Sequence, residues 1–351
     1  MQVKQTSGDL RNHHAPRRAL VTGGAGFIGF HLARRLLADG WQVTSVDGIT
    51  PYYDVALKRA RLTLLAAYPG FSSRELLLED TSFADAYADA APDVVFHLAA
   101  QAGVRYSLEN PDAYVDANLI GTYRLLELVR RRPPSHLLLA STSSVYGMGD
   151  DQPSAERGAT DQPLTLYAAT KKAMEVIAHS YSHLWKVPTT VTRFYSVYGP
   201  WGRPDMALFK FTKAILAGEP IDIYGHGEMT RDFTFVDDVI EALVRLAVVI
   251  PVQGEPASPE DPLSPVAPYR VVNIGGGQPV GLMTFIEAIE HRLGRAAQRR
   301  FLPMQPGDVA DTCAAGDLLR ALTGYRPTTP VDIGVGAFVD WYRAHKGVPC
   351  L

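Results

Sequence analysis

The sequence predicts an α/β fold, in which a doubly wound parallel sheet is followed by a smaller C-terminal α/β lobe. Three observations support this prediction. Short apolar segments alternate with segments of helical periodicity up to Ser196, as in sheets whose parallel strands are joined by helices. A glycine-rich segment separates the first apolar segment from the first helical one. After Ser196 the alternation loosens and Gly and Pro become frequent, which indicates a second substructure.

The individual elements follow from hydrophobic periodicity. Strands are expected at 18–24, 41–47, 74–80, 92–100, 136–141 and 188–196, and the main helices at 27–40, 55–67, 114–131 and 166–185. Because strand–helix–strand units give parallel neighbours, helices should cover both faces of the sheet. We therefore predict a Rossmann-type domain over residues 18–196, to which residues 231–250 return.

The remaining segments are assigned by their composition. The smaller lobe is expected from residues 197–230 and 269–349. Residues 251–268 contain six prolines and no periodicity, which is typical of an exposed loop. Residues 1–17 are polar and lack the apolar stretch of a secretory signal, so we expect a flexible tail there.

Composition and charge exclude several classes of function. The net charge of −3 gives no basic field for nucleic acid or anionic membrane. No apolar run reaches the ~18 residues of a membrane span. The two cysteines, Cys313 and Cys350, lie far apart without metal-ligand spacing. These features predict a cytoplasmic protein without a disulfide framework or a metal site.

The segment "TGGAGFIG" predicts a dinucleotide site, because it follows a predicted strand and opens a predicted helix. Gly23 permits the tight turn, Gly26 lets the backbone approach a pyrophosphate, and Gly29 lets helix and strand pack closely. The pyrophosphate would meet the free N–H groups of the helix start, where Phe27 and Ile28 lie.

Asp47 favours NAD over NADP. It closes the second predicted strand, where a carboxylate binds the adenosine ribose diol of NAD. Gly48 follows, and no Arg or Lys appears before Lys58. A 2′-phosphate would therefore meet a negative charge without a cation to offset it.

The segment "YAATK" places Tyr167 and Lys171 one helical turn apart, so that they share a face. A phenol has an ordinary pKa near 10, too high for a base at neutral pH. A neighbouring ammonium and a positively charged nicotinamide would both favour the phenolate. The pair follows a run of hydroxyl residues, Ser141–Ser144, at the end of the fifth predicted strand.

Together, "TGGAGFIG", "STSSVYG" and "YAATK" in this order resemble the extended short-chain dehydrogenase/reductase family of nucleotide-sugar enzymes. The resemblance extends from Arg18 nearly to the end of the chain. It implies that Tyr167 deprotonates the sugar 4-hydroxyl while NAD⁺ takes the C4 hydride. It also implies that Lys171 binds the nicotinamide ribose and that Thr142 shares the substrate hydrogen bond.

The residues after Thr142 distinguish the activities within that family. Its 4,6-dehydratases carry Asp-Glu there and its UDP-glucuronate decarboxylases carry Ser-Glu, whereas this chain has Ser143 and Ser144. Elimination needs a proton donor and an acceptor, and neutral hydroxyls serve poorly as either. Epimerisation at C4 needs neither.

Longer segments, "HLAAQAGVRYSLENPDAYVDANLIGT" and "YGPWGRPDMALFKFTKAI" among them, are similar to the UDP-glucuronate 4-epimerases of the family. That similarity implies interconversion of UDP-glucuronate and UDP-galacturonate with bound NAD. It also implies a homodimer formed through the helices Tyr114–Arg131 and Leu166–Trp185. A neutral UDP-hexose 4-epimerase and a UDP-glucuronate decarboxylase remain alternatives. A non-catalytic NAD-binding regulator is a third, disfavoured because Thr142, Tyr167 and Lys171 are all present.

A uronate oxidised at C4 is a β-keto acid that loses CO₂ easily, so its carboxylate has to be held. Arg203 could supply a charge-assisted contact, and Ser143, Ser144 and Ser196 could add hydroxyl donors. The resemblance implies further contacts: Asp80 with adenine, Ala99 and Gln101 along the NAD, Asn118 near the NAD or the nucleotide sugar, Arg231 with the UDP phosphates, Tyr224 on uracil and Asp308 with the uridine ribose. Gln305 stands where simple UDP-galactose-type epimerases have Arg, so that contact is weakened or rerouted.

Overall fold

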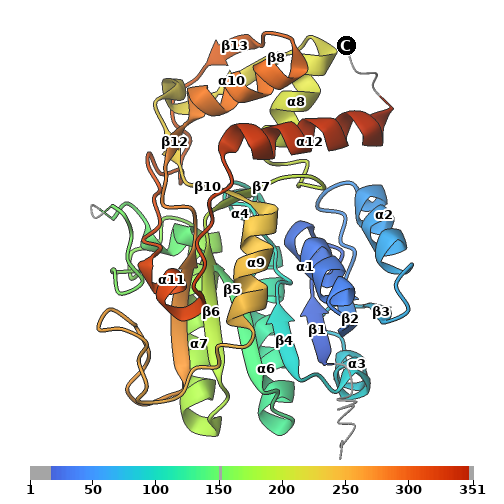
Figure 1. Cartoon of the computed structure of the whole chain (residues 1–351), viewed down its shortest axis with the longest axis vertical. Coiled ribbons are helices and arrows are strands. Elements are labelled where there is room, and N and C mark those ends of the chain that lie inside the picture. Colours follow the sequence, from blue (N-terminus) through green and yellow to red (C-terminus); the bar gives the residue numbers. More distant parts are fainter. Residues whose placement is uncertain (1–16, 150–151, 348–351) are drawn as a thin grey trace, which may run out of the picture.

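The computed structural model describes residues 17–149 and 152–347, and its main feature is a seven-stranded parallel sheet (Figure 1). The strands are β1 (Arg18–Thr22), β2 (Gln42–Asp47), β3 (Phe71–Glu75), β4 (Val94–His97), β5 (His136–Thr142), β6 (Thr189–Phe194) and β11 (Tyr269–Ile274). Their order is β11-β6-β5-β4-β1-β2-β3. The order reverses between β1 and β4, and such a switch point opens a crevice at the carboxyl ends of the strands.

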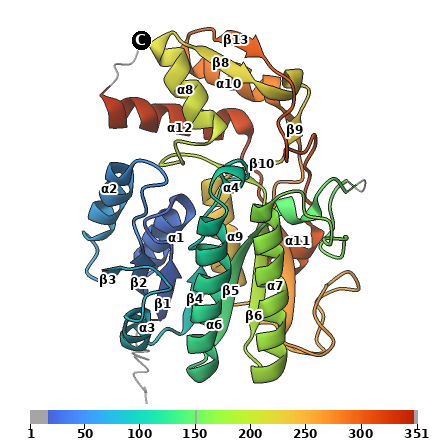
Figure 2. The same ribbon diagram turned by 180° about the vertical axis from the view of Figure 1, so that it is seen from behind.

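Helices cover both faces of this sheet. They are α1 (Phe27–Ala38), α2 (Val55–Leu65), α3 (Phe83–Ala90), α6 (Gly121–Arg131), α7 (Leu166–Trp185), α9 (Val236–Leu246) and α11 (Asp317–Thr323). Successive side chains along β1 point to opposite faces of the sheet. Ala19 and Val21 pack in one core with α1, α9 and α11, whereas Leu20 packs in the other with α3, α6 and α7. Figures 1 and 2 show the two faces in turn.

The smaller lobe lies over the carboxyl ends of the main strands (Figure 1). It contains α8 (Ala207–Ala217), α10 (Leu282–Leu293) and α12 (Val331–Lys346), with the parallel pair β8 (Pro220–Ile223) and β13 (Gln298–Phe301). These helices share a third hydrophobic core. Two short pairs join the halves: β7 (Ser196–Tyr198) with β10 (Phe233–Phe235), and β9 (Thr230–Arg231) with β12 (Val280–Gly281). This placement encloses the crevice between the two halves.

The predicted helix Tyr114–Arg131 is helical throughout but is not uniform. It comprises α5 (Asp112–Tyr114), the π-helical η1 (Val115–Ile120) and α6, and the short α4 (Tyr106–Glu109) precedes it. The 3₁₀ helices are η2 (Ser143–Tyr146) and η3 (Tyr224–Gly227). Single π-helical turns often occur at functional sites, and here the turn carries Asn118.

Two predicted elements are wrong in position. The third strand is Phe71–Glu75 rather than 74–80, because "LLL" continues past the sheet into a turn. Tyr269–Ile274, assigned from the sequence to the smaller lobe, is the edge strand of the main sheet and pairs in parallel with β6. Its placement depends on that long-range pairing, which no local pattern reveals. Residues 1–16 of the predicted flexible tail lie outside the described residues.

The Pro-rich segment 251–268 forms a loop, as predicted, but it is not uniformly exposed. Asp261 is 1% exposed, and its carboxylate accepts hydrogen bonds from Arg270 Nε of β11 at 2.9 and 3.1 Å. It also accepts from the backbone N–H groups of Ala257 and Leu263. One buried carboxylate thus fixes the loop to the sheet edge. Within the described ranges, no helix is long and apolar enough to cross a bilayer.

We expect Asp261→Ala to lower the free energy of unfolding by about 3 kcal/mol, because it leaves the Arg270 charge buried without its partner. Urea unfolding followed by circular dichroism measures this change. The matched control is Asp340→Ala, which removes an exposed ion pair with Arg292 and should cost less than about 1 kcal/mol. Equal losses in the two variants would contradict the anchoring role of Asp261.

Candidate active site

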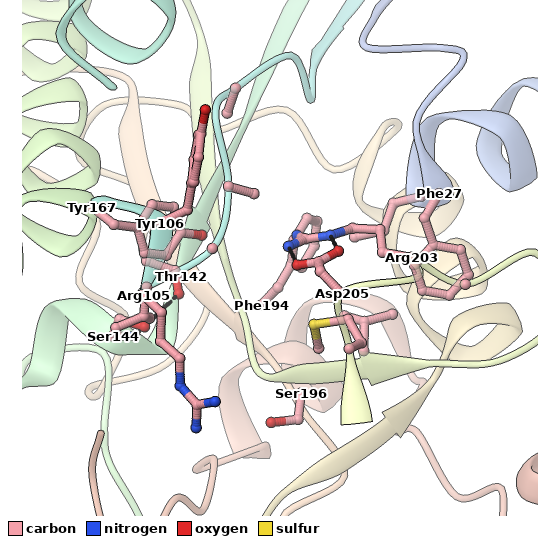
Figure 3. A pocket seen from close by; sticks show the side chains of 18 of the residues that line it. Phe27, Arg105, Tyr106, Thr142, Ser144, Tyr167, Phe194, Ser196, Arg203 and Asp205 are labelled. Carbon is pink, nitrogen blue, oxygen red and sulfur yellow. Dashed lines mark hydrogen bonds and ion pairs between the residues drawn. The ribbon is translucent and has the colours of Figure 1, made fainter. Parts of the chain in front are cut away.

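A cavity of about 1030 Å³ lies between the carboxyl ends of the main strands and the smaller lobe. Both halves line it (Figure 3). The predicted site residues on its wall are Gly23, Gly26, Phe27, Ile28, Gly29, Asp47, Ala99, Gln101, Thr142, Ser143, Ser144, Tyr167, Lys171, Ser196, Arg203, Tyr224, Arg231 and Asp308. Residues far apart in the sequence therefore meet in one concave space, as expected of a ligand site.

The glycine turn between β1 and α1 has the shape that a pyrophosphate requires. Gly23 has a φ of +75°, and a Cβ there would lie 2.7 Å from the Ala99 backbone nitrogen. A Cβ on Gly29 would lie 2.1 Å from the Gly23 carbonyl oxygen. No side chain caps α1, and its first turn carries no acidic residue. Its first N–H groups are therefore available to an anion, so the chain fits a dinucleotide here.

Asp47 lies at the end of β2, beside the glycine turn. Its carboxylate accepts hydrogen bonds from the N–H of Ala25 at 3.0 Å and of Ile49 at 2.9 Å, which fixes it at the cavity wall. The structure also brings Lys58 of α2 to this wall. Its ammonium donates to the Thr50 carbonyl at 2.8 Å, so the first cation after Asp47 in the sequence is already engaged by the chain.

Asp80 lies in the segment that follows β3. Its carboxylate turns back to accept from the Leu77 N–H at 2.8 Å, and it is not on the cavity wall. Because β3 ends at Glu75, the position next to Asp47 and Gly48 falls to Leu77 instead. The structure thus gives the Asp80 carboxylate a partner within the chain, and its adenine contact stays a prediction.

Asn118 lies behind the cavity wall rather than on it. It is 1% exposed, and its amide bonds both backbone groups of Gln101 and the Thr170 hydroxyl of α7. Asn118 thus fixes the loop after β4 to α7. It positions Gln101, and its contact with the NAD or the nucleotide sugar stays a prediction.

The predicted catalytic pair lies on the first turns of α7. Burial raises the pKa of Tyr167, while the Thr142 hydroxyl and the Arg203 guanidinium act in the opposite direction. Lys171 donates to the Ala140 carbonyl at 2.8 Å, and burial lowers its pKa to about 8. Arg203 therefore favours the phenolate of Tyr167, and the corresponding effect of Lys171 stays a prediction.

All four hydroxyl residues at the end of β5 lie at the cavity wall, but the Ser141 hydroxyl is bound to a partner within the chain. Ser141 is buried and donates to Glu175 of α7 at 2.6 Å, so it ties strand to helix. Thr142, Ser143 and Ser144 line the cavity. The Thr142 hydroxyl donates to the Ser144 oxygen at 3.1 Å and accepts from the Ser144 N–H. These three residues present neutral hydroxyls beside Tyr167.

Arg203 lies across the cavity from Thr142 and Tyr167 (Figure 3). Its guanidinium forms a two-point ion pair with Asp205, with Nε 3.0 Å from Oδ1. Tyr52 donates to the same carboxylate at 3.0 Å. The sequence analysis identified Arg203 but neither of these partners. Asp205 lies two residues further along the same loop, whereas Tyr52 reaches it only when the segments after β2 and β7 meet.

The far end of the cavity belongs to the smaller lobe. Arg231 donates to the carbonyls of Val309 and Ala310, the residues that follow Asp308. Arg105, which the sequence analysis missed, donates to Asp308 at 3.0 Å and lies over the Tyr224 ring at 4.4 Å. Arg105 thus contacts two residues predicted to bind uridine, and no spacing signal singled it out.

The comparisons with known proteins agree with this geometry. Residues 19–269 match the model of the NAD dependent epimerase/dehydratase family. A probable UDP-glucuronate 4-epimerase of Rhizobium meliloti (strain 1021) is 57% identical over 340 residues, which are 94% of this chain and all of that protein. UDP-glucuronate 4-epimerase 1 of Arabidopsis thaliana is 41% identical and covers 93% of this chain and 77% of its own length.

A solved structure is similar over nearly the whole fold. It is UDP-glucuronic acid 4-epimerase from Bacillus cereus in complex with UDP-glucuronic acid and NAD. The TM-score is 0.84 at 31% identity, and the match covers 93% of this chain and 99% of that chain.

The buried ammonium of Lys171 should lower stability. The pKa of Lys171 is about 8 in the folded protein, below the ordinary 10.5. Between these two pH values the unfolded chain binds the proton more tightly than the folded chain does. The free energy of unfolding therefore rises with pH over that range. We expect Lys171→Met to raise the free energy of unfolding by about 2 kcal/mol at pH 7, after allowing for the lost hydrogen bond. The gain should shrink at pH 10.

Urea unfolding at both pH values checks this, with Lys172→Met as the matched control on the same helix. Lys172 is only partly buried and its replacement should change stability little. A destabilised Lys171→Met protein at pH 7 would contradict the account.

Proposed function

Because the chain belongs to the NAD dependent epimerase/dehydratase family, we propose that it is a UDP-glucuronate 4-epimerase, which interconverts UDP-glucuronate and UDP-galacturonate. One observation carries the proposal beyond family membership. Arg203 shares a cavity with Thr142 and Tyr167, while Ser143 and Ser144 are neutral where elimination would require an acid and a base. The cavity thus offers a cation for a carboxylate and a base for a hydroxyl.

NAD, when bound, supplies a reversible hydride acceptor for C4. The glycine turn and the start of α1 would hold its pyrophosphate and Asp47 its adenosine ribose. Tyr167 takes the proton of the 4-hydroxyl and later returns it to the oxygen of the epimer. Thr142 hydrogen-bonds the same oxygen, and Lys171 orients the nicotinamide ribose. The 4-keto sugar has to turn over between these steps.

The UDP half would lie toward the smaller lobe. Tyr224 would stack on uracil, Asp308 would bind the ribose and Arg231 the phosphates. In the present structure Arg105 covers Tyr224 and pairs with Asp308. Arg105 therefore has to release both residues when uridine enters, and its cation then remains near the diphosphate.

The decisive experiment incubates the purified protein with UDP-glucuronate, without added NAD, and follows the sugar by NMR. Formation of UDP-galacturonate is expected. A UDP-pentose product would instead indicate a decarboxylase, and turnover of UDP-glucose alone would indicate a neutral hexose epimerase. Bound NAD without any turnover would indicate a regulator.

Tyr167→Phe should reduce kcat at least about a thousandfold, because it removes the base, while UDP binding measured by calorimetry stays nearly unchanged. Tyr325→Phe is the matched control. Its hydroxyl donates to Asp238 at 2.7 Å, away from the cavity wall, so kcat should be retained. Substantial turnover by Tyr167→Phe would refute the assignment of the base.

We also propose a homodimer through α6 and α7. These helices lie side by side on one face (Figure 2). Apolar side chains on η1, α6 and α7 are exposed: Ile120 by 41%, Tyr123 by 43% and Val176 by 58%. An apolar patch rimmed by charge is typical of a protein interface. A cytoplasmic location stays a prediction from the sequence.

Val176→Glu should therefore shift the protein from dimer to monomer in size-exclusion chromatography with light scattering, because it buries a charge at the interface. Ile333→Glu, an equally exposed apolar position on α12, should leave the dimer intact. A wild-type protein that is monomeric at micromolar concentration would exclude the dimer.

A further inference from the structure

Arg203 is held by the chain along one edge of its guanidinium. Nε and Nη2 donate to the two carboxylate oxygens of Asp205, and both side chains line the cavity with 20% and 25% exposure. Nη1 makes no hydrogen bond within the described part of the chain. Since a guanidinium carries five N–H donors in a rigid plane, the remaining edge is available to a second carboxylate.

Tyr52 in turn fixes Asp205. Its hydroxyl donates to Oδ2 at 3.0 Å, and its ring packs on Tyr106 at a centroid distance of 4.8 Å. Burial raises the pKa of Tyr52 to about 12, so the hydroxyl remains a donor at neutral pH. The carboxylate of Asp205 is thereby bound from two sides, and its partner guanidinium loses rotational freedom.

Gly103 leaves the space that the Tyr52 hydroxyl occupies. A Cβ on Gly103 would lie 2.4 Å from that oxygen and 3.6 Å from Nη2 of Arg203. Gly103 also has a φ of +104°, and its carbonyl accepts from the Tyr114 hydroxyl. The loops after β2, β4 and β7 therefore converge on Tyr52, Asp205 and Arg203.

The chemistry of a uronate gives this arrangement a consequence. Loss of CO₂ from the 4-keto sugar breaks the C5–C6 bond, whose electron pair enters the ketone as an enolate that is then protonated at C5. This occurs only when the C5–C6 bond lies across the ring plane and overlaps the ketone π system. For as long as the carboxylate is bound to a fixed guanidinium edge, the C5–C6 bond is kept out of that alignment.

We propose that Tyr52 and Asp205 are positioning residues that hold Arg203 in one orientation, so that the 4-keto uronate keeps its carboxylate. This inference rests on the proposed function. Neither residue touches the reacting atoms. Replacing either residue should change the ratio of pentose to epimer among the products, while the affinity for UDP stays the same.

The test follows ¹³C-labelled UDP-glucuronate by NMR with Asp205→Asn and Tyr52→Phe. Asn keeps the shape of Asp205 but accepts at one oxygen only. We expect the ratio of UDP-pentose to UDP-galacturonate to rise about tenfold in Asp205→Asn, which loses a charge-assisted bond, and about threefold in Tyr52→Phe. UDP affinity, measured by calorimetry, should stay within about twofold of wild type.

Two matched controls remove similar contacts elsewhere. Asp340→Asn weakens an aspartate–arginine pair on the surface, and Tyr325→Phe removes a tyrosine–aspartate bond outside the cavity. Both should keep the wild-type product ratio. An unchanged ratio in Asp205→Asn, or an equal rise in the controls, would overturn the inference.

The outcomes separate this inference from the proposed function. If wild type makes no UDP-galacturonate, the proposed function falls; if it does and the variants keep its product ratio, only the positioning role falls. Should Asp205→Asn fail to fold, as judged by circular dichroism, Tyr52→Phe decides the question, since it keeps the ring that packs on Tyr106.

Discussion

A buried ion pair between Glu175 and Arg193 fixes the helix on which the proposed chemistry depends. Glu175 lies two turns beyond Tyr167 on α7 and is 2% exposed. It binds Arg193 of β6 at 2.7 Å and accepts from Ser141 of β5, while its carbonyl accepts from Tyr269 of β11. Three adjacent strands therefore hold one turn of α7. A buried pair of this kind is costly to break, so the position of Tyr167 relative to the end of β5 is set by the sheet.

A second buried charge, on Arg61, connects the glycine turn with the loop that carries Arg203. Arg61 of α2 is 0% exposed, and its guanidinium donates to the carbonyl of Ala25 in the glycine turn and to the carbonyl of Trp201, next to the loop residue Arg203. His31 of α1 contacts the neighbouring Pro200 carbonyl at 2.9 Å. The segment that presents Arg203 is thus anchored on the elements that form the dinucleotide site. The proposed contacts for the cofactor and the carboxylate therefore share one continuous framework, although they come from different parts of the chain.

Burial of Tyr167 and Lys171 removes water that would solvate their charged forms. Burial raises the pKa of Tyr167 and lowers that of Lys171, so each group is driven toward its neutral form. Thr142 and Arg203 oppose this for the phenol, and a positively charged nicotinamide would add to them. In the proposed mechanism, bound cofactor and substrate therefore complete the surroundings in which Tyr167 acts as a base.

The sequence by itself determined the parallel sheet, the glycine turn, Asp47, the Tyr167–Lys171 pair and the neutral residues Ser143 and Ser144. Each of these depends on local periodicity or on short spacing within one strand–helix unit, which the chain encodes directly. Only the tertiary structure decided where β11 pairs, that Asp80 turns away and Asn118 lies behind the wall. It alone brought Arg105 to Asp308 and Tyr52 to Asp205. Those placements depend on contacts between loops distant in sequence, and such contacts exist only after the sheet and the smaller lobe have packed together.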